Sequence, residues 1–143
     1  MIQIEELRTE DFGLVARWVS TPTVNIWLTS VWRTKEMPPA LIAIAFRDRR
    51  NKFFIVRHDN TPCGLVALSD IDLADSTANV WYFLGEQSLG GRGIISAAVD
   101  QLTAWAFGEL KLASLHAWIM ENNVPSRRVL QKAGFREAGR LRK

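Results

Sequence analysis

The stretch GEQSLGGRGIISAAVDQLTAWAF, Gly85–Phe107, decides the fold, because it leads from a strand-like segment through a glycine loop into a helix. Gly90, Gly91 and Gly93 stand within four residues of one another. N–H groups at a helix start carry partial positive charge, and glycines let the backbone approach an anion without a Cβ in the way. The stretch therefore predicts either a phosphate-binding loop or a plain tight turn.

Two well-known phosphate loops do not fit this stretch. A Walker loop needs Lys followed by Ser or Thr after its last glycine, and Ile94 and Ile95 stand there instead. The dinucleotide fingerprint needs G-x-G-x-x-G, of which Gly91 and Gly93 supply only half. The glycine loop alone is therefore weak support for any particular ligand.

The segments on either side of the loop predict a mixed α+β fold. Strands are expected at 2–7, 53–58, 64–71, 76–85 and 114–120, and the turn DNTP at 59–62 predicts a hairpin. Helices are expected at 9–19 with Thr9 as its N-cap, from about Pro22, and at 40–50, 94–107 and 125–135. In the helix at 94–107, Ser96 falls on a different face from the apolar stripe. The last segment, EAGRLRK, could begin a further strand.

Length and composition indicate one globular domain over residues 1–143. The chain is 48% hydrophobic and 23% charged, and no apolar run approaches the roughly 18 residues of a membrane span. Cys63 is the single cysteine, which favours a reducing compartment and hence a cytoplasmic protein. One cysteine and two distant histidines make a metal site improbable, so no metal is expected.

The C-terminal segment is strongly basic and holds a second motif. Residues 127–143 carry seven Lys or Arg against Glu137 alone, which suits a polyanion or a phosphorylated ligand, or only a solvated surface. Within 125–135, Ser126 shares a helix face with Val129 and Leu130, so we expect it to point inward, with Arg127 and Arg128 outward. Taken alone, an inward serine at a helix start is more often structural than functional.

Together the two segments resemble the GNAT superfamily of acyl-CoA-dependent N-acetyltransferases. The family pairs a Q/R-x-x-G-x-G/A loop with a later N-x-x-S-x-x-x-L-x-K-x-G-F, and this chain has SLGGRG at 88–93 and NVPSRRVLQKAGF at 123–135. The resemblance is closest to the branch that acetylates ribosomal-protein N-termini. It implies a twisted mixed sheet whose two central strands splay apart, flanked by helices.

The resemblance also implies acetyl-CoA as acyl donor, with its pantetheine arm in the splay and its pyrophosphate on the glycine loop. The residues it assigns to this ligand are Phe83, Leu84, Leu89, Gly90, Gly91, Arg92, Gly93, Ile94, Ile95, Ser96, Asn123 and Ser126. The implied reaction is direct attack of a primary amine on the thioester, which needs a general base and a proton for the leaving thiolate. The acceptor could be a protein N-terminus, an amino sugar or another small amine.

The chain departs from the family at three positions. Ser88 replaces the first Gln or Arg of the loop, Asn79 replaces a common glutamate, and Leu130 replaces a common tyrosine. Ser126 remains the expected proton donor or thiol-positioning group. We nominate Asp70 or Asp72 as the base, although each could be a turn carboxylate. The weaker candidates are Glu86, His116 and His58.

Two other interpretations stay open. The missing glutamate and tyrosine fit a CoA-binding sensor or scaffold without turnover. The basic segment alone would fit nucleic-acid binding, but it carries no recognisable nucleic-acid signature, so this is not expected. Members of the family continue past the equivalent of Lys143 with a hairpin, so a short form could complete its sheet as a homodimer. No membrane partner is expected.

Overall fold

The strands of the protein form a single sheet in chain order. The structure, a computed structural model, describes residues 1–25, 28, 36–119 and 123–136. Within these residues the sheet has the order β1–β2–β3–β4–β5. The strands are β1 (Ile2–Glu6), β2 (Lys52–His58), β3 (Thr61–Asp72), β4 (Thr77–Leu84) and β5 (Ser114–His116). The first four pair antiparallel and β4 pairs β5 in parallel, so the predicted mixed α+β sheet is confirmed.

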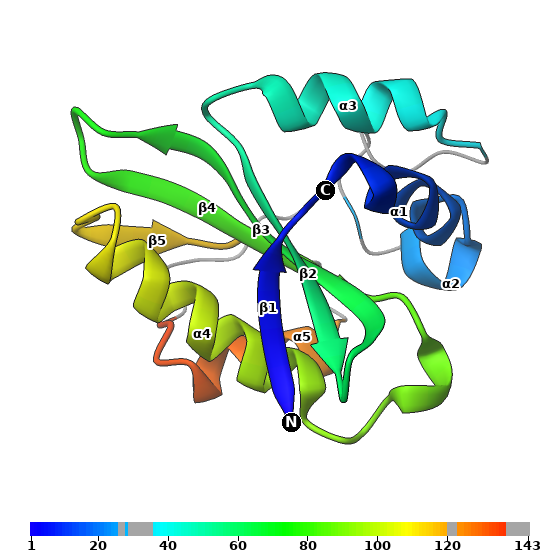
Figure 1. Ribbon diagram of the computed structural model, residues 1–143. Helices are drawn as coiled ribbons and strands as arrows, with labels where there is room; N and C mark the ends of the chain where they lie inside the picture. The colour runs from blue at the N-terminus through cyan, green and yellow to red at the C-terminus, as the bar shows by residue number, and fades with distance from the viewer. Residues whose placement is uncertain (26–27, 29–35, 120–122, 137–143) are drawn as a thin grey trace.

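Helices cover both faces of this sheet (Figure 1). On one face lie the short 3-10 turn η1 (Thr9–Asp11), α1 (Phe12–Val19), α2 (Pro22–Asn25) and α3 (Pro39–Arg47). On the other lie α4 (Ile94–Gly108) and α5 (Val124–Lys132), and a second 3-10 turn, η2 (Gln87–Leu89), belongs to the glycine loop. Each face therefore encloses its own hydrophobic core.

The alternation of side chains along β4 explains why both faces are buried. Trp81 and Phe83 contribute to the core under α1 and α3, whereas Val80, Tyr82 and Leu84 contribute to the core under α4. Successive strand residues point to opposite faces, so one apolar strand can serve two layers. β4 is thus the central element of the fold, and the glycine loop begins where it ends.

Local sequence signals predicted most turns correctly. Asp59 and Asn60, in the predicted DNTP turn, both have positive φ, as the two-residue turn that matches strand twist requires. Gly134 also has positive φ, at 94°, and follows Ala133, the C-cap of α5. The short helix expected from Pro22 and the helix expected at 40–50 are both present, although α3 ends at Arg47.

Two local expectations were wrong, and one residue is more buried than its helix position suggested. Thr9 does not cap the first helix: it opens η1, and the carboxylate of Asp11 accepts a hydrogen bond of 3.0 Å from the backbone N–H of Arg8. The strand expected at 114–120 ends at His116, because the chain parts from β4 there. Ser96 is buried, with 7% of its surface exposed, because the first turn of α4 packs against the sheet. The expected last strand lies in 137–143, outside the described residues.

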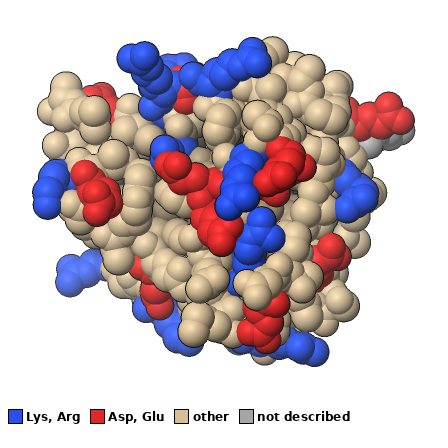
Figure 2. Space-filling model, in the orientation of Figure 1, with Lys and Arg blue, Asp and Glu red and all other residues tan. Residues whose placement is uncertain are grey.

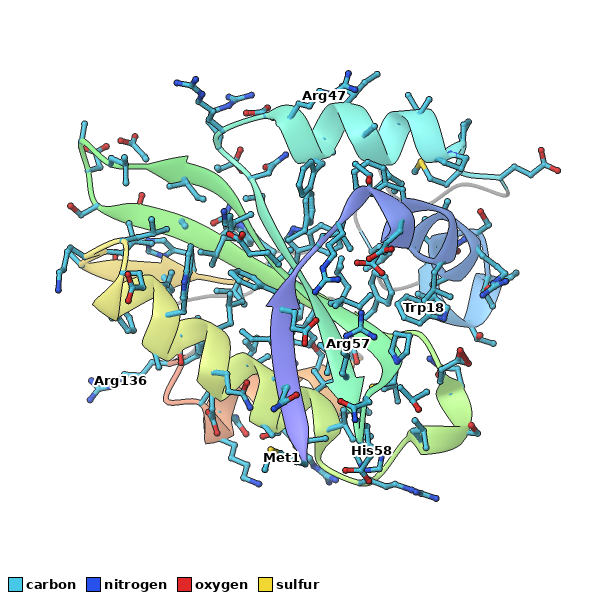
Figure 3. The ribbon with its side chains drawn as sticks, viewed as in Figure 1. Met1, Trp18, Arg47, Arg57, His58 and Arg136 are labelled. Atoms are coloured by element: carbon cyan, nitrogen blue, oxygen red, sulfur yellow. The ribbon has the colours of Figure 1, made fainter. Side chains whose placement is uncertain are left out.

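The end of β4 is fixed by a close contact at Gly85. The backbone N–H groups of Gly85 and Glu86 donate to the carbonyl of Cys63, at 2.7 and 3.0 Å. Trp18 on α1 lies beside this segment (Figure 3) and its Nε1–H donates to Glu86 Oε1 at 3.3 Å. A Cβ added to Gly85 would stand only 2.3 Å from atoms of the Trp18 ring. Only glycine fits this approach.

Replacing Gly85 with alanine is expected to lower the free energy of unfolding by about 1–3 kcal/mol, because the new Cβ overlaps the indole and packed interiors resist added atoms. Urea denaturation followed by circular dichroism measures this. Gly13→Ala is the matched control, since a Cβ there meets nothing within 4 Å and alanine suits the interior of α1. A Gly85→Ala variant as stable as the wild type would contradict the contact.

Charges of both signs are interleaved on the face seen in Figure 2. Arg57 pairs with Glu5 at 3.1 Å and with Asp11 at 3.9 Å, and Arg8 pairs with Glu10 at 3.2 Å. Mixed signs cancel at a distance, so this face produces no single-sign field that would attract a polyanion. Among the described residues, none of the helices is long and apolar enough to cross a membrane.

Candidate active site

A large cavity lies where β4 and β5 part. The two strands pair only from Thr77–Asn79 on β4 to Ser114–His116 on β5, and beyond Asn79 the described part of the chain gives β4 no strand partner on that edge. The space is about 940 Å³, near the top of the range of roughly 300–1,000 Å³ typical of ligand sites. Its wall includes the rest of β4, together with Trp118 and Ile119. The separation predicted for the two central strands is therefore present.

The glycine loop closes one end of the cavity. Gly91 and Gly93 have φ of 79° and 70°, the left-handed region that glycine adopts readily. Gly93 is the N-cap of α4 and has no side chain that could accept hydrogen bonds from the first turn of the helix. The first hydrogen bond of the helix joins the N–H of Ala97 to the carbonyl of Gly93, at 3.1 Å. The earlier N–H groups of the helix therefore have no acceptor within the helix and lie at the cavity, which is the arrangement that binds anions.

Ser96 adds a side-chain donor to the same end. Ser96 is one of the lining residues, and its buried Oγ has no hydrogen-bond partner among the described residues. A buried hydroxyl without a partner costs free energy, so its presence favours a ligand that accepts its hydrogen bond. The helical period placed Ser96 on another face, and burial of the helix start is what brings it to the site.

Two arginines border the cavity as well. Arg92 lies within the loop, and Arg128 lies on α5 with its side chain exposed at the cavity rim. The expected outward direction of Arg128 is confirmed, because its side chain is exposed, and the same residue also lines the cavity. Guanidinium groups form paired hydrogen bonds with phosphate oxygens, so both side chains suit a phosphorylated ligand.

The middle of the cavity holds a pair of hydroxyl groups. Tyr82 Oη lies 2.6 Å from Ser126 Oγ, and either oxygen could donate to the other. The Tyr82 hydroxyl could instead donate to the backbone carbonyl of Ser126, which lies 3.1 Å away. The backbone N–H of Ser126 donates to Asn123 Oδ1 at 3.3 Å, so the asparagine caps α5. Burial raises the pKa of the Tyr82 phenol, against the opposing effect of its bond to Ser126, so the phenol is protonated at neutral pH.

The far end of the cavity holds a carboxylate. Asp70 lies in an irregular part of β3, between Ser69 and Asp72, and has a φ of 51°. Asn79 Nδ2 donates to Asp70 Oδ2 at 3.0 Å, and both residues line the cavity. A non-glycine residue in the left-handed region is strained, and such strain clusters at functional sites. The irregularity turns Asp70 toward the splay.

The other acidic and histidine candidates lie elsewhere. Neither Asp72 nor Glu86 is among the described residues that line the cavity. The carboxylate of Asp72 accepts a hydrogen bond of 3.0 Å from the backbone N–H of Asp75 in the hairpin, and the carboxylate of Glu86 accepts one from Trp18 Nε1–H. His116 lies 3.5 Å from Ser114 Oγ on β5, and His58 lies near Asp59 at the N-terminal end of the sheet.

Cys63 is also remote from the cavity chemistry. Its side chain is fully buried in the core beneath α4, and its Sγ donates to the carbonyl of Val56 at 3.5 Å. Burial is the main reason that the pKa of the Cys63 thiol is raised, with a further contribution from Glu86. A buried, protonated thiol is a poor nucleophile, so nothing in this arrangement favours an acyl-cysteine intermediate.

All twelve residues that the resemblance assigns to acetyl-CoA line this one cavity. The cavity is also lined by residues that the sequence did not assign to the site, among them Thr23 and Val24 of α2, Tyr82 of β4, Gln87 of the loop and Arg128 of α5. Gln87 precedes Ser88, so a glutamine stands one position before the place where the family has Gln or Arg. Among the described residues, no group of three or more His, Cys, Asp or Glu side chains could hold a metal ion.

Comparison with known proteins identifies the family. A family model described as an acetyltransferase (GNAT) domain matches residues 2–136. YjcK of Bacillus subtilis, named as a candidate N-acetyltransferase, is 42% identical over 86 residues, which are 59% of this chain and 47% of YjcK. YdaF of the same organism, named as a candidate ribosomal N-acetyltransferase, is 33% identical over 85 residues, or 59% of this chain and 46% of YdaF. The matched segments thus span about half the length of these two relatives.

A solved structure agrees with the fold. A mutant of the spermidine N-acetyltransferase SpeG from Vibrio cholerae superposes with a TM-score of 0.82 at 17% identity, over 98% of this chain and 82% of the other. At this identity the likeness concerns the fold alone. The family model, however, covers almost the whole chain, and the cavity lies where the two motifs of that family meet. The chain belongs to the GNAT family of acetyltransferases.

Proposed function

We propose that this protein transfers an acetyl or related acyl group from acyl-CoA to a primary amine by direct attack. The observation that carries the proposal is the cavity itself, which joins an anion-binding helix start, a pair of hydroxyls and a carboxylate along one strand. The burial of Cys63 away from these groups favours direct attack over a covalent enzyme intermediate.

The order of the groups along β4 matches the order of atoms in the donor. Leu84 adjoins the loop, Tyr82 faces Ser126, and Asn79 holds Asp70. Strand residues advance about 3.3 Å each, so Asn79 and Leu84 are separated by roughly 17 Å. An extended pantetheine arm fits this interval, with its pyrophosphate at the loop, its sulfur near Ser126 and its acyl carbon short of Asp70.

The loop residues and the parted strand would hold the donor. The first N–H groups of α4, the Ser96 hydroxyl, Arg92 and Arg128 present donors to the phosphates. The open edge of β4 beyond Asn79 carries backbone N–H and C=O groups that suit the amides of pantetheine. A backbone N–H on that edge would also stabilise the oxyanion that forms when the amine attacks.

Asp70 is the base that the geometry favours. The family often has a glutamate at the position of Asn79, and here the Asn79 amide instead holds the carboxylate of the neighbouring strand at the same place. Asp70 can accept the proton that the attacking nitrogen must lose. Its negative charge also attracts an amine that arrives as an ammonium ion. Asp72, outside the cavity, is not proposed for this role.

The acceptor is proposed to be a cationic primary amine rather than an anionic compound. Asp70 is the acidic side chain among the described lining residues, and the aromatic residues Trp81 and Trp118 line the same cavity. Aromatic faces attract cations as carboxylates do. A protein N-terminus or a small amine both meet this description, and the name of YdaF makes ribosomal N-termini a sensible first peptide set.

The test is release of free CoA thiol from acetyl-CoA, followed with a thiol reagent across a panel of amines and N-terminal peptides. We expect release that depends on the amine, with a matching acetylated product by mass spectrometry. Binding of CoA without release by any amine would instead support the sensor or scaffold interpretation. Absence of CoA binding would exclude both.

A further inference from the structure

The contact between Tyr82 and Ser126 raises a question of proton count. The phenol has one proton and the serine hydroxyl has one, but the two oxygens share a single contact of 2.6 Å. If Tyr82 donates to the carbonyl of Ser126, at 3.1 Å, the serine must donate its own proton to Tyr82. If Tyr82 donates to Ser126 Oγ, the serine proton is free to point into the cavity. Only the second arrangement gives the site a donor from Ser126.

We propose that Tyr82 is a positioning residue, whose phenolic hydrogen bond turns the hydroxyl of Ser126 toward the sulfur of the leaving thiolate. This inference rests on the proposed function of the cavity. When the carbon–sulfur bond breaks, the electron pair stays on sulfur, and the chain from Tyr82 to Ser126 to the thiolate stabilises that charge until solvent protonates it. Hydrogen bonds in such a chain polarise one another, which strengthens the bond to sulfur.

The surroundings of Tyr82 favour this role over simple packing. Its ring packs in the core under α4, so the oxygen is held at the cavity wall rather than in solvent. The backbone of Ser126 is also held in place, because its N–H donates to Asn123 Oδ1. Burial raises the pKa of the Tyr82 phenol, so at neutral pH the phenol is protonated and does not repel the thiolate. The family tyrosine position holds Leu130, a buried side chain, so this phenol reaches the site from β4 instead of α5.

The experiment compares Tyr82→Phe, Ser126→Ala and the double variant with the wild type. Tyr82→Phe keeps the ring and removes one hydroxyl, so kcat is expected to fall about tenfold while the affinity for CoA stays the same, because the hydrogen bond that orients the Ser126 hydroxyl is lost. The double variant should be no slower than Ser126→Ala, because Tyr82 acts through the serine. Thr103→Val, which removes a hydroxyl from the surface of α4, is the matched control and should leave kcat unchanged.

A second readout does not depend on turnover. A thiolate absorbs far-ultraviolet light more strongly than a thiol does. A pH titration of that absorbance for bound CoA therefore gives the pKa of the bound thiol. That pKa should be about one unit higher in both variants than in the wild type, because Ser126→Ala removes the donor to the thiolate and Tyr82→Phe leaves that donor without the bond that orients it. An unchanged thiol pKa in Tyr82→Phe, or losses that add in the double variant, would overturn the proposal. Failure of the wild type to bind CoA would overturn the proposed function itself.

Discussion

A Gly91→Val variant is expected to bind CoA at least about tenfold more weakly than the wild type, a loss of about 1.4 kcal/mol. Gly91 has a φ of 79°, which a β-branched residue adopts only with strain, and it lines the cavity at the glycine loop, where we propose that the phosphates bind. Nothing lies within 4 Å of the position of its missing Cβ, so the added side chain would occupy the open space that the anion needs. Isothermal calorimetry measures the affinity.

Two comparisons make this result specific. Gly108→Val, at the opposite end of α4, adds the same side chain where nothing lies within 4 Å, and should bind CoA as the wild type does. Pantetheine lacks the pyrophosphate, so its affinity should hardly change in Gly91→Val. Equal affinity of wild type and Gly91→Val for CoA would mean that the loop does not hold the phosphates.

The parts of the fold that could be predicted are those set by neighbours in sequence. Residues close in sequence determine three such features: the left-handed glycines of the loop, the Asp59–Asn60 turn and the apolar strand β4. The anion site proposed at the loop follows from the same local signals, because glycines before a helix start leave its first N–H groups open to an anion.

The rest of the site depends on contacts that no local pattern contains. Tyr82 and Ser126 are 44 residues apart and meet only because α5, which packs against α4, begins beside β4. The helical period separates Ser96 from the apolar stripe but does not show that the packed first turn of α4 buries it. Asp70 could be nominated from the sequence but not separated from Asp72, since the irregular pairing of β3 with β4 decides which carboxylate faces the cavity.

Replacing Asp70 with asparagine is expected to lower kcat by about 10²–10⁴-fold at neutral pH, the usual contribution of a positioned general base. The amide is nearly the same size as the carboxylate, and its oxygen can still accept the hydrogen bond from Asn79 Nδ2. The substitution therefore removes the negative charge and the basicity while it preserves the local structure. Steady-state assays at saturating acetyl-CoA measure kcat, and calorimetry should find the affinity for CoA unchanged, because Asp70 lies at the opposite end of the cavity from the loop.

The pH dependence and a neighbouring aspartate distinguish a base from a structural carboxylate. As the pH approaches the pKa of the free acceptor amine, more of that amine is already neutral, so the deficit of Asp70→Asn should shrink. Asp72→Asn is the matched control: its side-chain oxygen can still accept from Asp75 N–H, and its kcat should equal that of the wild type. If the two variants lost activity equally, or if the deficit of Asp70→Asn were constant with pH, Asp70 would only support the hairpin, and the proton would have to leave through water.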